Sequence, residues 1–246
     1  MNQQHISMHK SLVLENLDQF RINWRSPVTK LMRSPLDMFL LWQIVKHFQP
    51  RSFLEIGFAA GQTMGIMYEA SQASGQYMSV DIEYDYSRLH IFESIFPSHN
   101  ISLHETDSKN IVFDADQKFD FIHIDGDHSY QGVINDLKKT WSLMHEQTIL
   151  YMDDHLLPEV DLAIRNEILA RSDFRPFLCG DNSVFFHHRS QNKSNFVDYH
   201  IQQKSCNFIY YINEELYDTL VLHARLPNVF VDHTQIFMDT LKAYNL

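Results

Sequence analysis

Ligand-type side chains are concentrated in one short stretch of the chain, "FIHIDGDHSYQGVINDL" at residues 121–137. The stretch opens with apolar residues typical of a buried strand, and it then places Asp125, Asp127 and His128 within four positions, before a helix-like run. A second apolar run, "TILYMDD", ends in the pair Asp153-Asp154. Carboxylates and an imidazole at strand ends suit metal binding and proton transfer. Asp127 is interpreted as a solvent-facing turn residue.

Alternating strands and helices are expected to position these groups. Apolar runs at 52–57, 77–82, 101–106, 119–125 and 148–154 predict strands, and helical patterns at 34–48, 61–73, 85–95, 130–144 and 158–171 predict helices. This alternation predicts an α/β fold with a parallel sheet covered on both faces, and such sheets bind ligands at the carboxyl ends of their strands. Two further strands, 174–179 and 183–188, are close enough to form a hairpin, which would make the last strand antiparallel.

A second group of residues marks the ends of the first three strands. The turn "EIGFAAGQT" contains Glu55, Gly57 and Gly61, and its glycines allow a sharp turn and a close approach to a ligand. Asp81 ends the second strand, where an acid can accept hydrogen bonds from both hydroxyls of a ribose. Asp107 and Ser108 follow the third strand, where an adenine edge would lie. A tight strand–helix turn without a ligand is the alternative interpretation of the glycines.

In these motifs, over residues 36–188, the sequence resembles the class I S-adenosylmethionine-dependent methyltransferases. The resemblance implies a Rossmann-like seven-stranded sheet of order 3-2-1-4-5-7-6, with strand seven antiparallel. It also implies that Gly57 and Gly61, preceded by the motif acid Glu55, cradle the methionine part of the cofactor. Asp81 would hold the ribose, and Asp107-Ser108 would lie at the adenine.

In that strand order, Asp125, Asp153 and Asp154 lie on neighbouring strands beside the reacting end of the cofactor. Clustered carboxylates repel one another, and a hard divalent cation such as Mg²⁺, Mn²⁺ or Ca²⁺ relieves the repulsion. His128 is the predicted general base, because its ordinary pKa of about 6.5 suits proton removal near neutrality.

The combination "IDGDHSYQGVINDL…YMDDH" is similar to the metal-dependent macrolide-sugar O-methyltransferases of tylosin and mycinamicin biosynthesis, and more distantly to catechol O-methyltransferase. This resemblance implies that Asp125, Asp153 and Asp154 bind the metal and that His128 is the base. The family commonly has a Gly-Gly turn before strand five, and here "MHEQT" at 144–148 takes its place.

Composition excludes several classes of partner. The formal net charge of −11 argues against nucleic acid, which requires a basic surface. The apolar runs are too short to span a bilayer, and with two cysteines a reducing cytoplasm is expected.

We expect an N-terminal helical segment at 1–50, with one helix at 11–25, and a cofactor-binding domain at 51–189. Residues 190–246 form a C-terminal extension, interpreted as a packed helical extension, a substrate lid or an interface for a homo-oligomer.

The predicted function is metal-assisted O-methylation of a hydroxyl on a small molecule, such as a sugar or natural product, with S-adenosylmethionine and Mg²⁺ or another divalent cation. Three alternatives stay open: a metal-independent or nitrogen-directed methyltransferase, a metal-dependent hydrolase, and a non-catalytic module that keeps the cofactor fold. The hydrolase has no use for Glu55, Asp81 and Asp107. The module would be favoured if His128 pointed away from the pocket.

Overall fold

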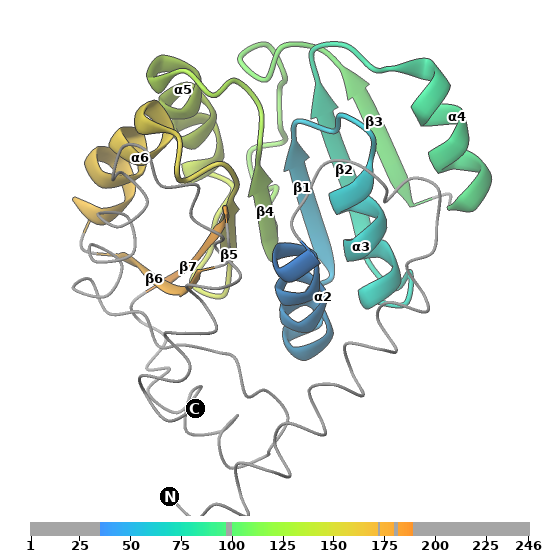
Figure 1. The fold of residues 1–246 in the computed structure, drawn as a ribbon, viewed down its shortest axis with the longest axis horizontal. Coiled ribbons are helices and arrows are strands. Elements are labelled where there is room, and N and C mark those ends of the chain that lie inside the picture. Colours follow the sequence, from blue (N-terminus) through green and yellow to red (C-terminus); the bar gives the residue numbers. More distant parts are fainter. Residues whose placement is uncertain (1–34, 97–99, 172, 180–181, 189–246) are drawn as a thin grey trace, which may run out of the picture.

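The structure, a computed structural model, describes residues 35–96, 100–171, 173–179 and 182–188 (Figure 1). The predicted helix at 11–25 and the extension at 190–246 lie outside the described residues, so the proposed domain boundaries stay predictions. Within the described part, no helix is both long enough and apolar enough to cross a membrane.

Seven strands of the described chain form one sheet in the order β3-β2-β1-β4-β5-β7-β6, which confirms the predicted order. Neighbours from β3 to β5 are parallel, whereas β7 runs antiparallel to both β5 and β6. The hairpin expected from the close spacing of the last two strands is therefore confirmed. The strands are β1 (Ser52–Ile56), β2 (Gln76–Asp81), β3 (Ile101–Glu105), β4 (Phe121–Ile124), β5 (Ile149–Met152), β6 (Phe174–Cys179) and β7 (Val184–His188).

Helices cover both faces of the sheet, with α2, α3 and α4 on one face and α5 and α6 on the other (Figure 1). Their bounds are α2 (Pro35–Phe48), α3 (Gln62–Ala70), α4 (Tyr86–Ile95), α5 (Tyr130–Trp141) and α6 (Pro158–Ala163). The helix expected over 158–171 is not uniform, because a π-helix, η2 (Ile164–Leu169), continues α6. The wider turn is visible where the Ala170 N–H donates to the carbonyl of Arg165, five residues earlier.

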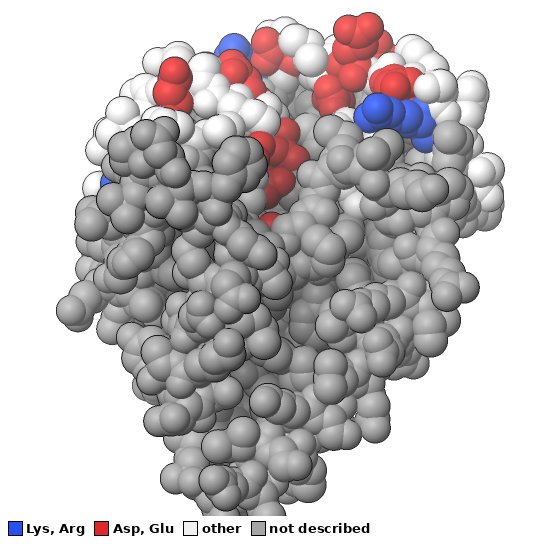
Figure 2. All heavy atoms as spheres, viewed as in Figure 1, with Lys and Arg blue, Asp and Glu red and all other residues white. Residues whose placement is uncertain are grey.

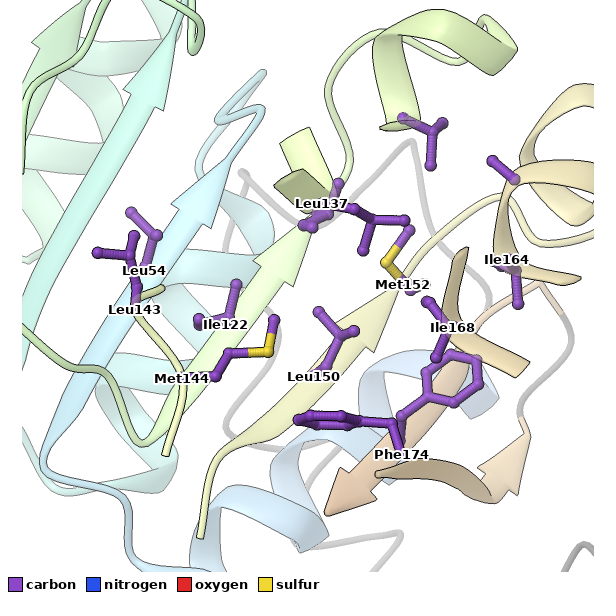
Figure 3. Packing of buried hydrophobic residues seen from close by; sticks show 14 of the residues in the cluster. Leu54, Ile122, Leu137, Leu143, Met144, Leu150, Met152, Ile164, Ile168 and Phe174 are labelled. Carbon is purple, nitrogen blue, oxygen red and sulfur yellow. The ribbon is translucent and has the colours of Figure 1, made fainter. Parts of the chain in front are cut away.

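The period-two alternation of the strands divides the core into two clusters. In β4, Phe121 packs with the cluster beneath α2 and α3, whereas Ile122 and Ile124 pack with the cluster on the other face. Figure 3 shows the second cluster, in which Ile122 of the sheet lies among side chains that include Leu137 of α5. Both faces of the central strands are therefore buried, and polar side chains can reach solvent only at the strand ends.

The turn before β5 is closed by side chains rather than by glycine. The His145 N–H donates to Thr148 Oγ1 (2.8 Å), and the Thr148 N–H donates to the carbonyl of His145 (3.0 Å). Thr148 Oγ1 also donates to the carbonyl of Phe119, which fixes the turn against the chain that enters β4. These hydrogen bonds explain how "MHEQT" replaces the Gly-Gly turn that is common in the resembled family.

Strand β6 ends the sheet irregularly. Pro176 pairs with Phe186 of β7, and the register shifts between Pro176 and Leu178. Proline lacks a backbone N–H, and it occurs within sheets mainly at edge strands and bulges, which is its place here.

Candidate functional site

A pocket lies at the carboxyl ends of β1, β4 and β5, where the predicted functional residues were expected to meet. Figure 2 shows acidic side chains within a hollow of this face. The residues that line the pocket are Asp37, Gly57, Phe58, Ala59, Ala60, Gln62, Thr63, Asp125, His128, Asp153, Asp154 and Asn182.

The turn between β1 and α3 needs glycine at both predicted positions. Gly57 has a φ of +93°, and a Cβ on it would lie 2.0 Å from the backbone oxygen of Asp125. Gly61 has a φ of +71°, and a Cβ there would lie 2.5 Å from the Phe58 ring. Both conformations are unfavourable for residues with a side chain. The glycine turn and the end of β4 are thus in direct backbone contact, which joins the two groups of residues found in the sequence.

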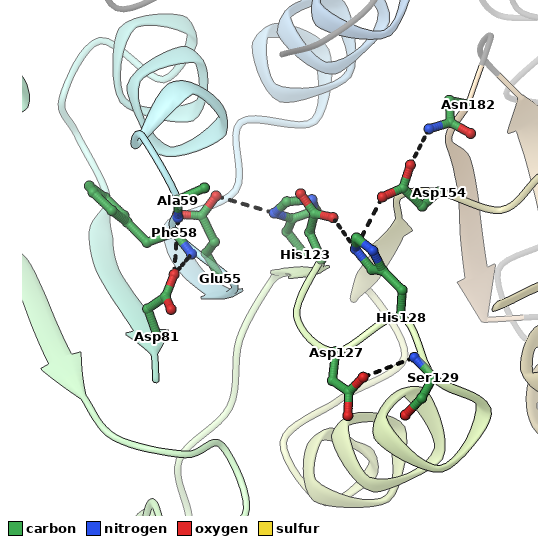
Figure 4. Close-up of polar contacts among 11 residues, drawn as sticks. Glu55, Phe58, Ala59, Asp81, His123, Asp127, His128, Ser129, Asp154 and Asn182 are labelled. Carbon is green, nitrogen blue, oxygen red and sulfur yellow. Dashed lines mark hydrogen bonds and ion pairs between the residues drawn. The ribbon is translucent and has the colours of Figure 1, made fainter. Parts of the chain in front are cut away.

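Asp81 holds the glycine turn in place. Its Oδ2 accepts hydrogen bonds from the N–H groups of Phe58 (2.7 Å) and Ala59 (3.0 Å). Its Oδ1 accepts from the N–H of Glu83 (3.2 Å). Figure 4 shows this carboxylate pointing at the turn from the end of β2. Its role as the ribose acceptor stays a prediction, and the structure adds a role in positioning the loop.

Glu55 lies beneath the pocket rather than in its lining. The side chain is 1% exposed, and Oε1 lies 3.2 Å from Nδ1 of His123 on β4. Oε2 accepts from Ser79 Oγ at 3.5 Å. The motif acid is therefore one layer below the surface that a cofactor would contact, although its assignment to cofactor binding is not tested by this arrangement.

The residues after β3 meet α5. Ser108 Oγ donates to Asp136, and Asp107 accepts from the backbone N–H of Lys109 (2.9 Å). Asp136 is 3% exposed, and burial raises the pKa of its carboxyl to about 6. Asp136 was not predicted as a site residue, because an acid inside an amphipathic helix usually faces solvent.

His128 lies between two of the predicted ligands and lines the pocket. Its Nε2 is 3.2 Å from Asp125 Oδ1 and 3.1 Å from Asp154 Oδ2 (Figure 4). The hydrogen bond to Asp125 raises the pKa of His128 above its ordinary value of 6.5, and the charge of Asp154 acts in the same direction. Ser129, not His128, is the N-cap of α5, because its side chain accepts from the N–H of Gly132.

The donors at this edge form two overlapping groups, each compact enough to hold a metal ion. One consists of His123, Asp125 and Asp153, and the other consists of Asp125, His128 and Asp154, with all donor atoms of a group within 4.8 Å of one another. The predicted set of Asp125, Asp153 and Asp154 is divided between them. Mixed carboxylate and imidazole donors fit a divalent cation. Asp127, by contrast, is exposed and accepts from the Ser129 N–H, as expected of a turn residue.

Two pocket residues, Asp37 and Asn182, were not predicted from the sequence. Asp37, in the first turn of α2, is 2% exposed and accepts hydrogen bonds from Ser183 Oγ and from the N–H of Asn182 (3.2 Å). The Asn182 side chain donates in turn to Asp154. Asp37 lies in a segment that predicts only a helix, and its contact with Asn182 spans 145 residues of sequence, so no local pattern predicts it.

Comparison with known protein families supports the methyltransferase interpretation. Residues 54–155, from β1 to just beyond β5, match the family model described as a methyltransferase domain. Over these residues the chain is similar to methyltransferase domains. The sheet order is the one implied by the resemblance to class I S-adenosylmethionine-dependent methyltransferases. A search of curated protein sequences finds no match to the chain.

Several solved methyltransferase structures share the fold of this chain. A methyltransferase from Podospora anserina, bound to S-adenosylhomocysteine, has a TM-score of 0.52 and 17% identity, over 72% of this chain and 88% of its own. An O-methyltransferase from Bacillus cereus, also bound to S-adenosylhomocysteine, has a TM-score of 0.51 and 17% identity, over 71% and 91%. The TDP-rhamnose 3′-O-methyltransferase of calicheamicin biosynthesis has a TM-score of 0.51 and 11% identity, over 61% and 78%.

Proposed function

We propose that this methyltransferase domain transfers the methyl group of S-adenosylmethionine to a hydroxyl of a small molecule, with the help of a divalent cation. The observation that carries the proposal is the shared pocket. Gly57 and its turn, where the cofactor is expected, line the same pocket as Asp125, His128 and Asp154. The proposal therefore puts the methyl donor and the proton acceptor in the same pocket.

The carboxylates that follow β4 and β5 support the binding of a divalent cation in the pocket. Asp125 belongs to both compact donor groups, and Asp153 and Asp154 each complete one of them. A cation bound there would lower the pKa of an acceptor hydroxyl and orient it. The fold holds these carboxylates close together, and a bound cation would relieve their mutual repulsion.

His128 supplies the proton acceptor. In the ligand-free chain its imidazole bridges Asp125 and Asp154, so a cation at these carboxylates competes for the same oxygens. The neutral imidazole accepts the hydroxyl proton, the hydroxyl oxygen attacks the methyl carbon in line with the sulfur, and S-adenosylhomocysteine leaves. The reaction needs no covalent enzyme intermediate, and positioning contributes much of the rate.

The acceptor is proposed to be a hydroxylated sugar or natural product. Two structural neighbours act in natural-product biosynthesis, one on TDP-rhamnose and one in tomaymycin synthesis. These likenesses are too distant to carry the substrate across, so this part of the proposal also rests on the sequence motifs around Asp125 and Asp153.

The alternatives left open by the sequence make different use of these residues. A hydrolase would need no glycine turn at the edge of the acidic pocket, yet Gly57 directly contacts the Asp125 backbone. A non-catalytic module would be favoured by a His128 turned away from the pocket, yet His128 lines it.

Calorimetry of the full chain with S-adenosylhomocysteine, with NAD as a control ligand, tests the cofactor assignment. We expect binding of S-adenosylhomocysteine and none of NAD. A screen of hydroxylated sugars and natural products for methylated product, with and without excess chelator, then tests the reaction. Tight NAD binding without S-adenosylhomocysteine binding would overturn the cofactor assignment. Full turnover in chelator would remove only the cation.

A further inference from the structure

A row of polar side chains crosses the buried face of the sheet below the pocket. Ser79, Glu55 and His123 occupy paired positions on β2, β1 and β4, and Tyr151 of β5 continues the row. All four side chains are at most 1% exposed, and their neighbours on this face include Phe53 and Phe121. Placing a carboxylate and an imidazole in an apolar core is costly unless each group is well paired, so the pair needs an explanation.

The contacts of His123 fix both the plane and the direction of its ring. Nδ1 lies 3.2 Å from Glu55 Oε1, and the ring stacks on Tyr151 with centroids 4.8 Å apart and an interplanar angle of 25°. Figure 4 shows the ring between Glu55 and the His128 side of the site. A donor atom of His123 lies within 4.8 Å of donor atoms of Asp125 and Asp153, which come just after β4 and just after β5.

We propose that His123 is a nitrogen ligand of the cation, through the ring nitrogen that Glu55 does not engage. Glu55, His123 and the cation would then form the carboxylate–histidine–metal arrangement common in proteins, in which the carboxylate fixes the tautomer and orientation of the ligating ring. The inference rests on the proposed function, because it assumes the cation at Asp125. It assigns Glu55 a role in positioning the ligand His123.

His123 fits the ligand role better than His128 does. The ring of His123 is fully buried and is held by Glu55 and Tyr151, whereas His128 is 43% exposed and bridges two carboxylates near solvent. A ligand benefits from a fixed ring, whereas a proton acceptor must exchange its proton with solvent. The two imidazoles around Asp125 thus have separate tasks.

The proposal predicts which cations bind. One imidazole and two carboxylates form a softer donor set than carboxylates alone, so Mn²⁺ and Co²⁺ should bind more tightly than Mg²⁺. Removing the imidazole should reduce this preference, because the remaining donors are oxygens.

Metal titrations of the full chain without cofactor test the assignment. Co²⁺ binding is followed by visible absorption, Mn²⁺ binding by electron paramagnetic resonance, and Mg²⁺ by competition with Mn²⁺. We expect His123→Gln to weaken Co²⁺ binding at least about 10-fold and to affect Mg²⁺ less, and Glu55→Gln to weaken Co²⁺ binding by about 10–100-fold. His128→Gln should retain Co²⁺ affinity. Unchanged Co²⁺ affinity in a folded His123→Gln protein would overturn the proposal.

Pulsed electron paramagnetic resonance keeps the test decisive if His123→Gln does not fold. Mn²⁺ bound to the His128→Gln protein should still show coupling to an imidazole nitrogen. Loss of that coupling would make His128 the ligand, and a wild-type spectrum without nitrogen coupling would favour carboxylates alone. A wild-type chain that binds no cation yet binds S-adenosylhomocysteine would remove the cation and this inference together, and would leave the cofactor assignment standing.

Discussion

Asp81 combines two tasks in one carboxylate. Its Oδ2 accepts from the N–H groups of the glycine turn, and the same group is the predicted acceptor for ribose hydroxyls. Asp81→Ala should therefore weaken S-adenosylhomocysteine binding by about 1.5–3 kcal/mol, the cost of losing hydrogen bonds to a charged group. Calorimetry measures the change.

Glu83→Ala is the matched control for Asp81, because Glu83 is an exposed acid two residues later. It should leave cofactor affinity near that of the wild type. Equal effects of the two substitutions would show that general negative charge, rather than the position of Asp81, supports binding.

His128 is not needed to cap α5, because the neighbouring residue Ser129 does so. Since Ser129 caps α5, His128→Ala should cost little stability while turnover falls about 10²–10⁴-fold, the usual range for one general base. The wild-type rate should rise with pH through one ionisation, because only neutral imidazole accepts a proton. The hydrogen bond to Asp125 places that ionisation above pH 6.5 in the ligand-free chain. Steady-state rates across pH measure both effects.

His90→Ala is the control for His128, because that histidine is exposed on α4, where its Nδ1 lies 3.5 Å from Glu93. It should keep the wild-type rate and pH profile. A His128→Ala enzyme that is fully active with an unchanged pH profile would remove His128 from the mechanism.

Helix α2 is joined to the loops of the pocket through Asp37. This buried carboxylate accepts from Asn182 and Ser183, and Asn182 donates to Asp154. Asp37→Asn replaces one acceptor oxygen by a donor group, so a buried N–H or O–H loses its partner. We expect a loss of about 1–3 kcal/mol in the free energy of unfolding, together with lower turnover through a displaced Asp154.

Denaturant unfolding and turnover of Asp37→Asn, compared with Ser183→Ala, measure this link. Ser183→Ala removes a single donor to the same carboxylate and should have a smaller effect on turnover, because it leaves Asn182 and Asp154 in place. Unchanged stability and rate in Asp37→Asn would show that α2 packs on the sheet without supporting the site.

The predictions from the sequence agree with the structure where they rest on hydrophobic periodicity or on the position of a residue at the end of a strand. The order of the strands was implied by the resemblance to class I methyltransferases, and it is confirmed. The meeting of the predicted site residues follows from the parallel sheet, which brings the carboxyl ends of its strands to one edge. Contacts between side chains that lie far apart in the sequence leave no local pattern from which they could be predicted. His123 sits at a position that reads as part of a buried strand, and its pairing with Glu55 depends on the register of β1 with β4.

The free energy of unfolding of the protein should depend on pH through the carboxyl group of Asp136. Its pKa of about 6 in the folded chain lies above the ordinary 3.8, so the folded state binds the proton more tightly than the unfolded state does. Stability from this group is therefore fully present below about pH 4 and is lost as pH rises to about 6. Asp136→Asn should remove this dependence and raise the free energy of unfolding at pH 7 by up to about 2 kcal/mol, since Ser108 can still donate to the amide oxygen.

Unfolding of Asp136→Asn at pH 5 and pH 8 measures the effect, with the exposed Asp116→Asn as control. The control should change neither the stability nor its pH dependence. A lower stability of Asp136→Asn at pH 8 would mean that the charged carboxylate has a favourable partner, and that burial does not dominate its energetics.

The irregular strand β6 has a consequence for assembly. Its proline cannot donate to a neighbouring backbone, and the shifted register at Pro176 interrupts the row of groups that a further strand would pair with. Growth of the sheet by strand addition is thereby disfavoured at this side. The opposite margin, β3, runs regularly beside β2 from Ile101 to Glu105, so among the described strands it is the one open to intermolecular pairing. Aggregation of this chain, where it occurs through the sheet, should therefore begin at β3.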